Sequence, residues 1–391
     1  MKDNIPLLRR VVDDVASSCV ELRRRIHRRP ELSNQEVATT AAIAEFLAER
    51  GIEARVRRSG VGALTDVGTG SRRVAFRADL DALPIQEATG APYASEIPGR
   101  MHACGHDVHA AIAAGIALTL QHLDLPGSAR FIFQHAEEAP PGGAFDLVDE
   151  GALEGVEAIL AFHVDPSLEV GRVGLRSGAI TSSSDRFEIT VEGPGGHTAR
   201  PHETVDTIYA ASLITTQLPA LLHRLVDSRK PMALVFGQIH GGSADNVIPA
   251  RVEISGTARA LDRELWEELP ALVDRLVADI VAPTGAKAVL HYQRGIAPVI
   301  NSAMVVAEVE FAVVNALGPQ AVAVTEPSLG AEDFALYLDK VPGALVRLGV
   351  ALPDRRALHS STFDIDESSI KTGILVGAAS LLRMMGRHWR S

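Results

Sequence analysis

The segment at residues 101–109, MHACGHDVH, gathers more metal-binding side chains than any other stretch of this chain. It contains one cysteine, Cys104, together with three histidines and an aspartate, and His106 lies two residues after Cys104. Burying such polar groups without partners is expensive. A divalent cation is the simplest partner, because thiolate, imidazole and carboxylate groups are its usual protein ligands.

Three strands predicted from apolar runs end in acidic or imidazole groups. The strand at 73–78 leads into Asp79-Leu80-Asp81, the strand at 129–134 into His135-Ala136-Glu137-Glu138, and the strand at 158–162 into His163-Val164-Asp165. In open α/β sheets, ligands bind at the carboxyl ends of the strands, so we expect these groups to converge. Together with Cys104 and His106, these groups supply more ligands than one cation requires, which predicts a two-metal site. Adjacent residues point in different directions, so one of Glu137 and Glu138 can ligate while the other transfers protons.

The segments that must position these groups alternate between helix and strand. Helices are predicted at 7–28, from the Ser33–Glu36 capping box to Gly51, and at 106–122, with short strands at 52–58 and 61–67. Strands that are apolar on both faces indicate a mainly parallel sheet flanked by helices, and therefore an α/β fold.

The middle of the chain follows a different order. Strands at 185–192, 232–240, 251–259 and 287–293 and helices at 204–222 and 263–282 give the order β-α-β-β-α-β of a ferredoxin-like unit. Afterwards the pattern predicts helices at 302–317, 331–340 and 367–385 and a strand at 344–350. We therefore expect a catalytic metal-binding domain from residues 1–179 and 296–391, with a small α+β domain, 180–295, inserted into it.

Composition limits the classes of partner and the compartment. The chain has 391 residues, 46% of them hydrophobic, which is enough for two domains. A net charge of -11 argues against nucleic acid and against an anionic membrane. The two cysteines, Cys19 and Cys104, form no disulfide framework. We find no apolar stretch typical of a signal peptide or a membrane span, so we expect a cytoplasmic protein.

Seven motifs carry a resemblance to a known family: RADLDALPIQE, MHACGHDVH, FQHAEEAPPGGA, GGHTARPH, NVIP, GAEDF and LHSSTF. In order and spacing they resemble the M20 metallopeptidases, and most of all the branch of aminoacylases, hippurate hydrolases and auxin-conjugate hydrolases. The resemblance extends over nearly the whole chain, from HRRPELSNQE to FDIDE.

The resemblance implies a set of metal ligands, namely Cys104, His106, Glu138, His163 and His359. It implies two divalent ions per subunit, with Zn or Mn as the first candidates and Co or Ni also suited to these donors. We expect Cys104 to contact both ions. Asp81 and His109 are expected to orient the ligands through hydrogen bonds.

The same resemblance assigns the inserted domain to a lid that also forms a homodimer. His197, in GGHTARPH, is then expected to reach the site of the neighbouring subunit and polarise the scissile carbonyl. Asn246 and Arg259 match positions that hold the carboxylate of the substrate, for which a guanidinium group is well suited. Gly330 is expected to line the substrate pocket.

The activity implied is metal-dependent hydrolysis of the amide bond of N-acyl amino acids or related small conjugates, carboxypeptidase-like, by a metal-bound water with Glu137 as the general base. Two alternatives stay open. One is a protein without catalytic activity that binds a small molecule or peptide on the same metal-binding fold. The other is a thiol amidase with Cys104 and His106 as the nucleophile pair.

Some residues depart from the family pattern or have a simpler interpretation. His135 and Ser361 stand where relatives commonly have proline, which bears on specificity more than on catalysis. His27 is interpreted as a histidine at a helix end, and Glu332-Asp333 as acidic partners of the first turn of a helix.

Overall fold

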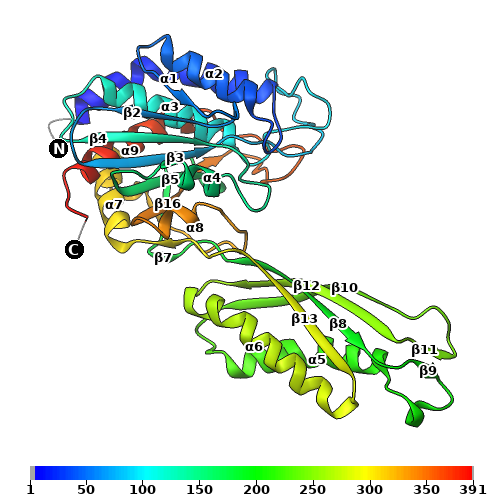
Figure 1. The fold of residues 1–391 in the computed structure, drawn as a ribbon. Coiled ribbons are helices and arrows are strands. Elements are labelled where there is room, and N and C mark those ends of the chain that lie inside the picture. The colour runs from blue at the N-terminus through cyan, green and yellow to red at the C-terminus, as the bar shows by residue number, and fades with distance from the viewer. Residues whose placement is uncertain (1–4, 390–391) are drawn as a thin grey trace. The chain divides into compact units, whose positions relative to one another are not determined.

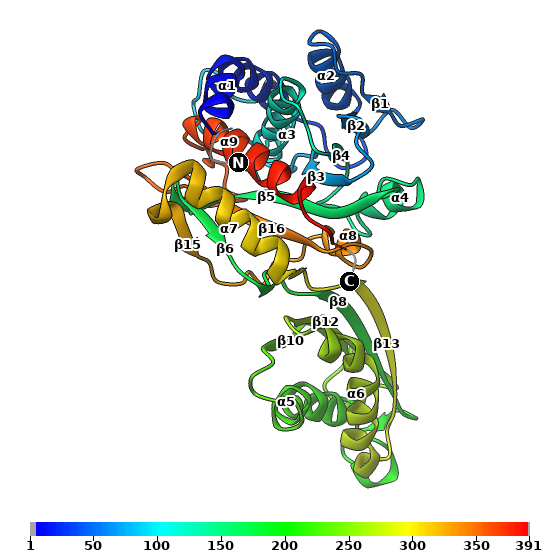
Figure 2. The same cartoon turned by 90° about the vertical axis from the view of Figure 1, so that its left-hand side faces the viewer.

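The computed structural model describes residues 5–389, and the chain divides into two compact units (Figures 1 and 2). The first unit comprises the chain up to Gly178, Ile300–Glu326 and the chain from Asp333 onward. The second unit comprises Ala179–Val299 and the short segment Pro327–Glu332. Within the described residues, no helix is both long and apolar enough to cross a membrane.

An eight-stranded sheet forms the centre of the first unit, in the order β1-β2-β4-β3-β5-β16-β6-β15. The strands are β1 (Arg55–Val56), β2 (Ala63–Val67), β3 (Arg73–Asp79), β4 (Ser128–Gln134), β5 (Val156–Glu169), β6 (Val173–Leu175), β15 (Val322–Val324) and β16 (Gly343–Ala351). The four middle strands run parallel, whereas the pairs β1–β2, β2–β4 and β16–β6 are antiparallel. The parallel middle strands therefore end at one edge, where a site is expected.

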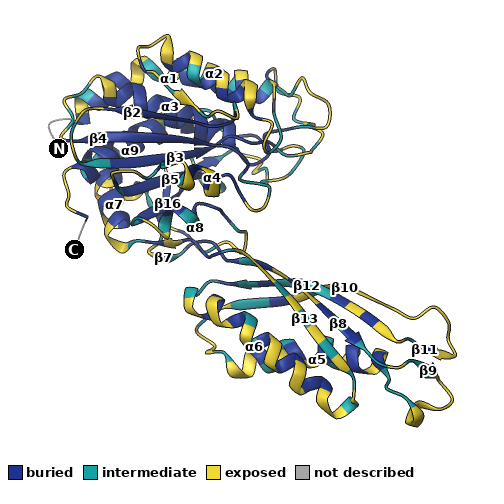
Figure 3. Cartoon of the chain, viewed as in Figure 1, coloured by how far each residue is buried: buried dark blue, intermediate teal, exposed yellow. Residues whose placement is uncertain are grey.

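Seven helices flank this sheet in the described part of the first unit: α1 (Ile5–Arg28), α2 (Val37–Ala48), α3 (His106–Gln121), α4 (Ala144–Asp149), α7 (Ala303–Leu317), α8 (Ala335–Leu338) and α9 (Ser368–Met385). Helix α3 packs against α1, α9 and β3. It is buried from His106 to Leu120, as the dark blue ribbon in Figure 3 shows. A helix that is apolar on nearly all sides, as α3 is from Ala110 to Leu118, is typically buried, and α3 is therefore a fixed support for the residues at its N-terminus.

The second unit has an antiparallel sheet in the order β10-β12-β8-β13. Its elements are β8 (Ser184–Glu192), β9 (Gly196–His197), α5 (Thr207–Leu225), β10 (Met232–Gly241), β11 (Val247–Ile248), β12 (Arg251–Ala260), α6 (Arg263–Val281) and β13 (Lys287–Ile296). Each helix starts at an aspartate that accepts a backbone hydrogen bond, Asp206 for α5 and Asp262 for α6. The ferredoxin-like order of these elements is the one predicted. The two-residue strands β7 (Gly178–Ala179) and β14 (Ile300–Asn301) pair with each other.

Two predicted elements are shorter in the structure. The strand at 52–58 is reduced to Arg55–Val56, because only two residues pair with β2. The helix at 331–340 is reduced to Ala335–Leu338. The side chain of Asp333 binds partners in the sheet of the first unit, which holds this part of the chain in a turn.

The predicted capping box at Ser33–Glu36 is wrong. Helix α2 begins at Val37, and neither of these side chains caps it. The carboxylate of Glu31 accepts hydrogen bonds from Ala38 N–H at 3.1 Å and from Thr39 N–H at 2.7 Å. Since Glu31 satisfies these first-turn donors, Ser33 and Glu36 are available for other contacts.

Candidate metal centre

The predicted donors of the first unit lie at the carboxyl edge of its sheet. β4, β3 and β5 are parallel neighbours, so their ends meet at the same edge. β3 ends at Asp79, and Glu138 follows the end of β4 by four residues. β5 continues beyond the predicted strand at 158–162, because its pairing with β16 extends through His163. His163 therefore lies within a strand and not after it.

Cys104 and His106 are positioned by the start of α3. Gly105, between them, has a φ of 82°, in the left-handed region that favours glycine. A Cβ atom at this position would lie 2.5 Å from Cγ2 of Val164. Glycine therefore allows the loop before α3 to approach β5 closely, and this brings Cys104 next to His163.

Five predicted ligands form two groups in the structure. Cys104 Sγ lies 3.5 Å from His163 Nε2 and 3.3 Å from His359 Nε2. His359 Nε2 is 3.4 Å from Glu138 Oε1, which is itself 4.0 Å from His106 Nε2. One group of donor atoms within 4.8 Å of one another comprises Cys104, His106 and His163, and another comprises Cys104, Glu138 and His359. Cys104 belongs to both groups.

The hydrogen bonds of two histidines fix which nitrogen faces the cluster. His106 Nδ1 lies 3.2 Å from a carboxylate oxygen of Asp81, and His163 Nδ1 lies 2.8 Å from the carbonyl oxygen of Val164. Carboxylate and carbonyl oxygens only accept, so each Nδ1 carries the proton. Nε2 is then the nitrogen of each ring that faces the cluster, as in a histidine that ligates a metal.

Two atoms of the cluster lack a hydrogen-bond partner among the residues described. They are His106 Nε2 and Glu138 Oε1, both buried. Buried polar atoms are normally satisfied, and an unpaired lone pair facing a thiol and a carboxylate needs an explanation. The donor set therefore fits divalent cations, which would use both lone pairs.

Asp81 and His109 hold the surrounding backbone and side chains. Asp81 accepts from His106 through one oxygen, and from the backbone N–H of Glu138 at 2.9 Å through the other. His109 donates to Asp79 at 2.6 Å and accepts from the backbone N–H of Val164 at 2.9 Å. Both ring nitrogens of His109 are thus used, which leaves it no lone pair for a metal.

Burial affects the chemistry available to Cys104. It raises the pKa of the thiol to about 12, although the nearby ring of His106 acts in the opposite direction. A nucleophilic cysteine needs a thiolate at neutral pH. The environment of Cys104 therefore disfavours the thiol amidase alternative.

Comparison with known proteins decides the family. A model of peptidase family M20/M25/M40 matches residues 75–383. The chain belongs to this family. Its relatives include the N-acetyl-L-cysteine deacetylase of Bacillus subtilis, 38% identical over 90% of this chain and 84% of the relative. They also include the N-acyl-L-amino acid amidohydrolase of Geobacillus stearothermophilus, 40% identical over 75% and 80% of the two chains.

Solved structures agree with the M20 assignment. The structure of a Bacillus subtilis protein described as a dinuclear metal binding peptidase from the M20 family has a TM-score of 0.86 to this chain. The two chains are 33% identical, and the match covers 96% of this chain and 99% of the other. The α/β fold with a mainly parallel sheet, predicted from the sequence, is confirmed.

One buried network next to the cluster of predicted donors was missed by the sequence analysis. The fully buried Arg77 donates to Asp79 at 2.6 Å, to Asp333 at 2.7 Å and to Gln134 at 2.8 Å. Asp333 also accepts from Gln134 and from the backbone N–H of Ala144 at 3.1 Å. The interpretation of Asp333 as a partner of a helix dipole is therefore wrong. An arginine within the apolar part of a strand is the signal that could have revealed this network.

A second network includes His27, which lies in the last turn of α1 as predicted. This residue is buried, and its Nδ1 lies 2.8 Å from Asp107, which immediately follows His106. Arg23 donates to the same carboxylate at 2.6 Å and to Asp364 at 3.1 Å. Helix α1 therefore connects the start of α3 with the loop that carries His359.

Four predicted substrate-contacting residues lie in the second unit. His197 is exposed on β9, and its Nδ1 accepts from Ala199 N–H at 3.1 Å. Asn246 is exposed before β11, while Arg259 on β12 donates to the carbonyl oxygen of Leu329 at 2.7 Å. The exposed Gly330 follows Leu329. Their roles at the metal centre stay predictions.

The two departures from the M20 pattern have local partners. The ring of His135 is buried, 3.0 and 3.1 Å from a guanidinium nitrogen of Arg57, and its Nε2 is 3.4 Å from Asp146. Burial lowers the pKa of His135, and the positive charge of Arg57 adds to this effect. The carbonyl oxygen of Ser361 accepts from Ala88 N–H at 2.8 Å. Neither residue replaces a donor of the cluster.

Proposed function

We propose that this protein is a dinuclear metal amidohydrolase that hydrolyses the amide bond of N-acyl amino acids or related small amide conjugates. The observation that carries the proposal is the presence of two donor groups that share Cys104. The names of the two relatives support the substrate class, because both describe amino acids whose nitrogen carries an acyl group.

The proposal assigns five ligands to two ions. Cys104, His106 and His163 would hold one, and Cys104, Glu138 and His359 the other. Zn and Mn are the first candidates for this set, and Co and Ni are also compatible with it. Divalent ions bound here would supply Lewis-acid polarisation of the scissile carbonyl and would lower the pKa of the attacking water.

Glu137 is assigned the proton transfers. Its carboxylate has an oxygen within 4.8 Å of a donor atom of His106 and of Glu138, and the residue is half-buried. Glu137 takes a proton from the water as the oxygen of the water bonds to the acyl carbon. It then delivers this proton to the amide nitrogen as the C–N bond breaks. The products are a carboxylic acid and an amino acid with a free amine.

The second unit completes the proposal as a lid and as the contact between two copies. His197 of the partner subunit would donate to the developing oxyanion, while Asn246 and Arg259 hold the carboxylate of the substrate beside Gly330. The edge strand β10 supports a homodimer, because it carries the exposed apolar residues Val235 and Ile239. We place the enzyme in the cytoplasm, where a cysteine ligand stays reduced.

The test compares Glu137→Gln with Glu49→Gln, which changes an exposed glutamate after α2. Both proteins are loaded with Zn or Mn and assayed on acetyl, benzoyl, long-acyl and indole-acetyl amino acids. Loss of the general base should lower kcat by about 100- to 10,000-fold. Elemental analysis should still find about two ions per chain, and Glu49→Gln should behave as wild type. Near wild-type turnover by Glu137→Gln would remove Glu137 from the mechanism.

Chelation separates this proposal from both alternatives. EDTA or phenanthroline should abolish turnover, and added metal should restore it. A thiol amidase would stay active after chelation, and a protein that only binds its ligand would turn over none of the acyl amino acids in any metal form.

A further inference from the structure

Glu36, directly before α2, contacts the loop that follows β4 and does not cap its own helix. Because Glu31 accepts from the first turn of α2, the side chain of Glu36 is released from the predicted cap. Glu36 is completely buried, and one of its oxygens accepts from the backbone N–H of Ala136 at 2.7 Å. Its other oxygen has no hydrogen-bond partner among the residues described.

Ala136 adopts a backbone conformation that needs outside support. Its φ is 50°, in the left-handed region that residues other than glycine rarely occupy. Glu36 binds its N–H, and its carbonyl oxygen accepts from Gly143 N–H at 3.0 Å. The turn is therefore held on both sides of Ala136.

This turn sets the direction of the two glutamates that follow. It lies just beyond the end of β4, and Glu137 comes directly after it. On the far side, the backbone N–H of Glu138 donates to Asp81 at 2.9 Å. Asp81 in turn accepts from Ser33 Oγ at 2.7 Å. The segment that carries Ser33 and Glu36 thus holds the backbone both before and after Glu137.

We propose that Glu36 is a positioning residue for Glu137, and that it acts by holding the left-handed turn at Ala136 through the Ala136 N–H. This inference rests on the proposed function, which makes Glu137 the general base. The hydrogen bond of the buried carboxyl is made with the backbone N–H of Ala136 and not with a predicted metal ligand. A shift of about 1 Å in a catalytic group can lower a rate by about 100-fold, so the turn is a sensitive point.

The nature of the contact distinguishes two substitutions. Glu36→Gln keeps a carbonyl oxygen of the same reach and can still accept from Ala136 N–H. Glu36→Leu is of similar volume and removes the acceptor. Glu45→Gln, on the exposed side of α2, is the matched control.

The experiment measures kcat, KM, metal content and thermal unfolding for the metal-loaded full-length variants. Glu36→Leu should lower kcat by about 10- to 100-fold with KM and metal content unchanged. Glu36→Gln should restore kcat to within about threefold of wild type, because it keeps the acceptor. In a Glu137→Gln background, Glu36→Leu should cause no further loss, because the group that it positions no longer transfers protons. Should Glu36→Leu be insoluble, Glu36→Ala removes the same acceptor.

Four results would overturn the inference: wild-type kcat for Glu36→Leu, equal losses for the Leu and Gln variants, an additive loss in the Glu137→Gln background, or a fall in kcat that parallels a loss of metal. Failure of the proposed function looks different, because Glu137→Gln would then itself stay active. A Glu36→Leu variant with wild-type kcat beside an inactive Glu137→Gln would refute the positioning role alone.

Discussion

Replacing Arg77 by methionine should destabilise the first unit more than any change at a solvent-facing ion pair. Arg77 is 1% exposed and lies between the buried carboxylates of Asp79 and Asp333. Methionine retains the apolar part of the side chain and removes the charge. Both carboxylates then stay buried without their cation, which typically costs about 3–5 kcal/mol. The remaining hydrogen bonds, from His109 to Asp79 and from Gln134 to Asp333, keep the loss of stability within this range.

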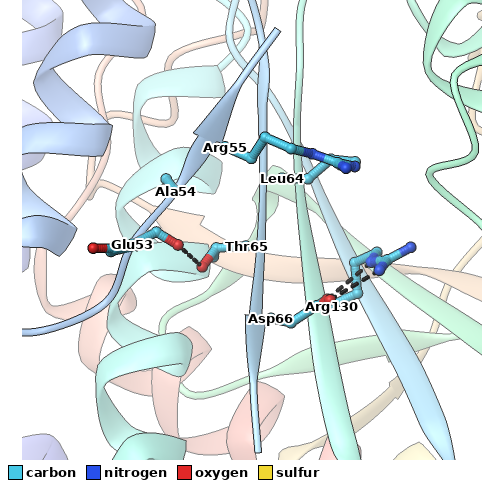
Figure 4. A pocket seen from close by; sticks show the side chains of 7 residues that line it. All are labelled: Glu53, Ala54, Arg55, Leu64, Thr65, Asp66 and Arg130. Atoms are coloured by element: carbon cyan, nitrogen blue, oxygen red, sulfur yellow. Dashed lines mark hydrogen bonds and ion pairs between the residues drawn. The ribbon is translucent and has the colours of Figure 1, made fainter.

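Arg130→Met is the matched control on the neighbouring strand. Arg130 binds Asp66 through two hydrogen bonds of 2.8 Å, so the local geometry is as good as that of Arg77. The Asp66 side chain, however, is 37% exposed, and the pair lines a pocket of about 320 Å³ (Figure 4). Water can solvate Asp66 after the arginine is removed, and Arg73 stays 3.6 Å away. Arg130 also donates to the carbonyl oxygens of Gly151, Ala152 and Glu154, so the expected loss is about 1–2 kcal/mol, which is still below that for Arg77.

The two tryptophans of the chain make the assay specific. Trp389 is in the first unit and Trp266 in the second. In a Trp266→Phe background, fluorescence during urea unfolding therefore reports the first unit. Metal is removed beforehand, because ligand binding would add to the measured stability. A loss for Arg77→Met no larger than that for Arg130→Met would refute the reasoning. Asp333→Asn, which leaves Arg77 paired with Asp79, provides a milder variant for the same comparison.

Two further predictions concern pH and assembly. Burial raises the pKa of Glu36 to about 7, against about 4.3 in an unfolded chain, so the native state retains a proton between these pH values that the unfolded state has lost. The stabilising contribution of Glu36 is complete below about pH 4 and declines as the pH rises through 7. The free energy of unfolding of Glu36→Gln relative to wild type should therefore increase by about 2–3 kcal/mol between pH 5 and 8, measured by urea unfolding of metal-free protein. A difference in unfolding free energy that does not change with pH would contradict this. Sedimentation should find a dimer of the 41.6 kDa chain. Val235→Glu on edge strand β10 should give monomers with kcat about 100- to 1000-fold lower. The control Val289→Glu, on the opposite edge strand, should stay dimeric. A fully active monomer would remove His197 from the site of the partner.

The parts of the fold that the sequence predicted well are those set by local pattern. Buried strands such as β4 and the mainly apolar helix α3 have a period and length that identify them. The donors around Cys104 stood out because thiol and imidazole groups at this spacing have few other uses. The position of Asp79 and Glu138 at the carboxyl edge of the sheet followed from the topology of parallel sheets.

What the sequence did not predict depends on contacts between distant segments. The Ser33–Glu36 pattern suits a capping box, yet Glu31 competes successfully for the same backbone donors. Nothing in the local sequence indicates that Glu36 faces Ala136, a hundred residues away. In the same way, Asp333 looks like the first turn of a helix until Arg77, on β3, is seen to bind it.

The order in which the donors are synthesised follows from the way the first unit is interrupted. Cys104, His106, Glu138 and His163 all precede the second unit, whereas His359 comes about 200 residues after His163. At about 5–20 residues per second, a ribosome needs on the order of 10–40 s to cover that distance. During this time a nascent chain carries one complete group of donors and lacks a member of the other. Loading with metal during translation would therefore proceed in two stages.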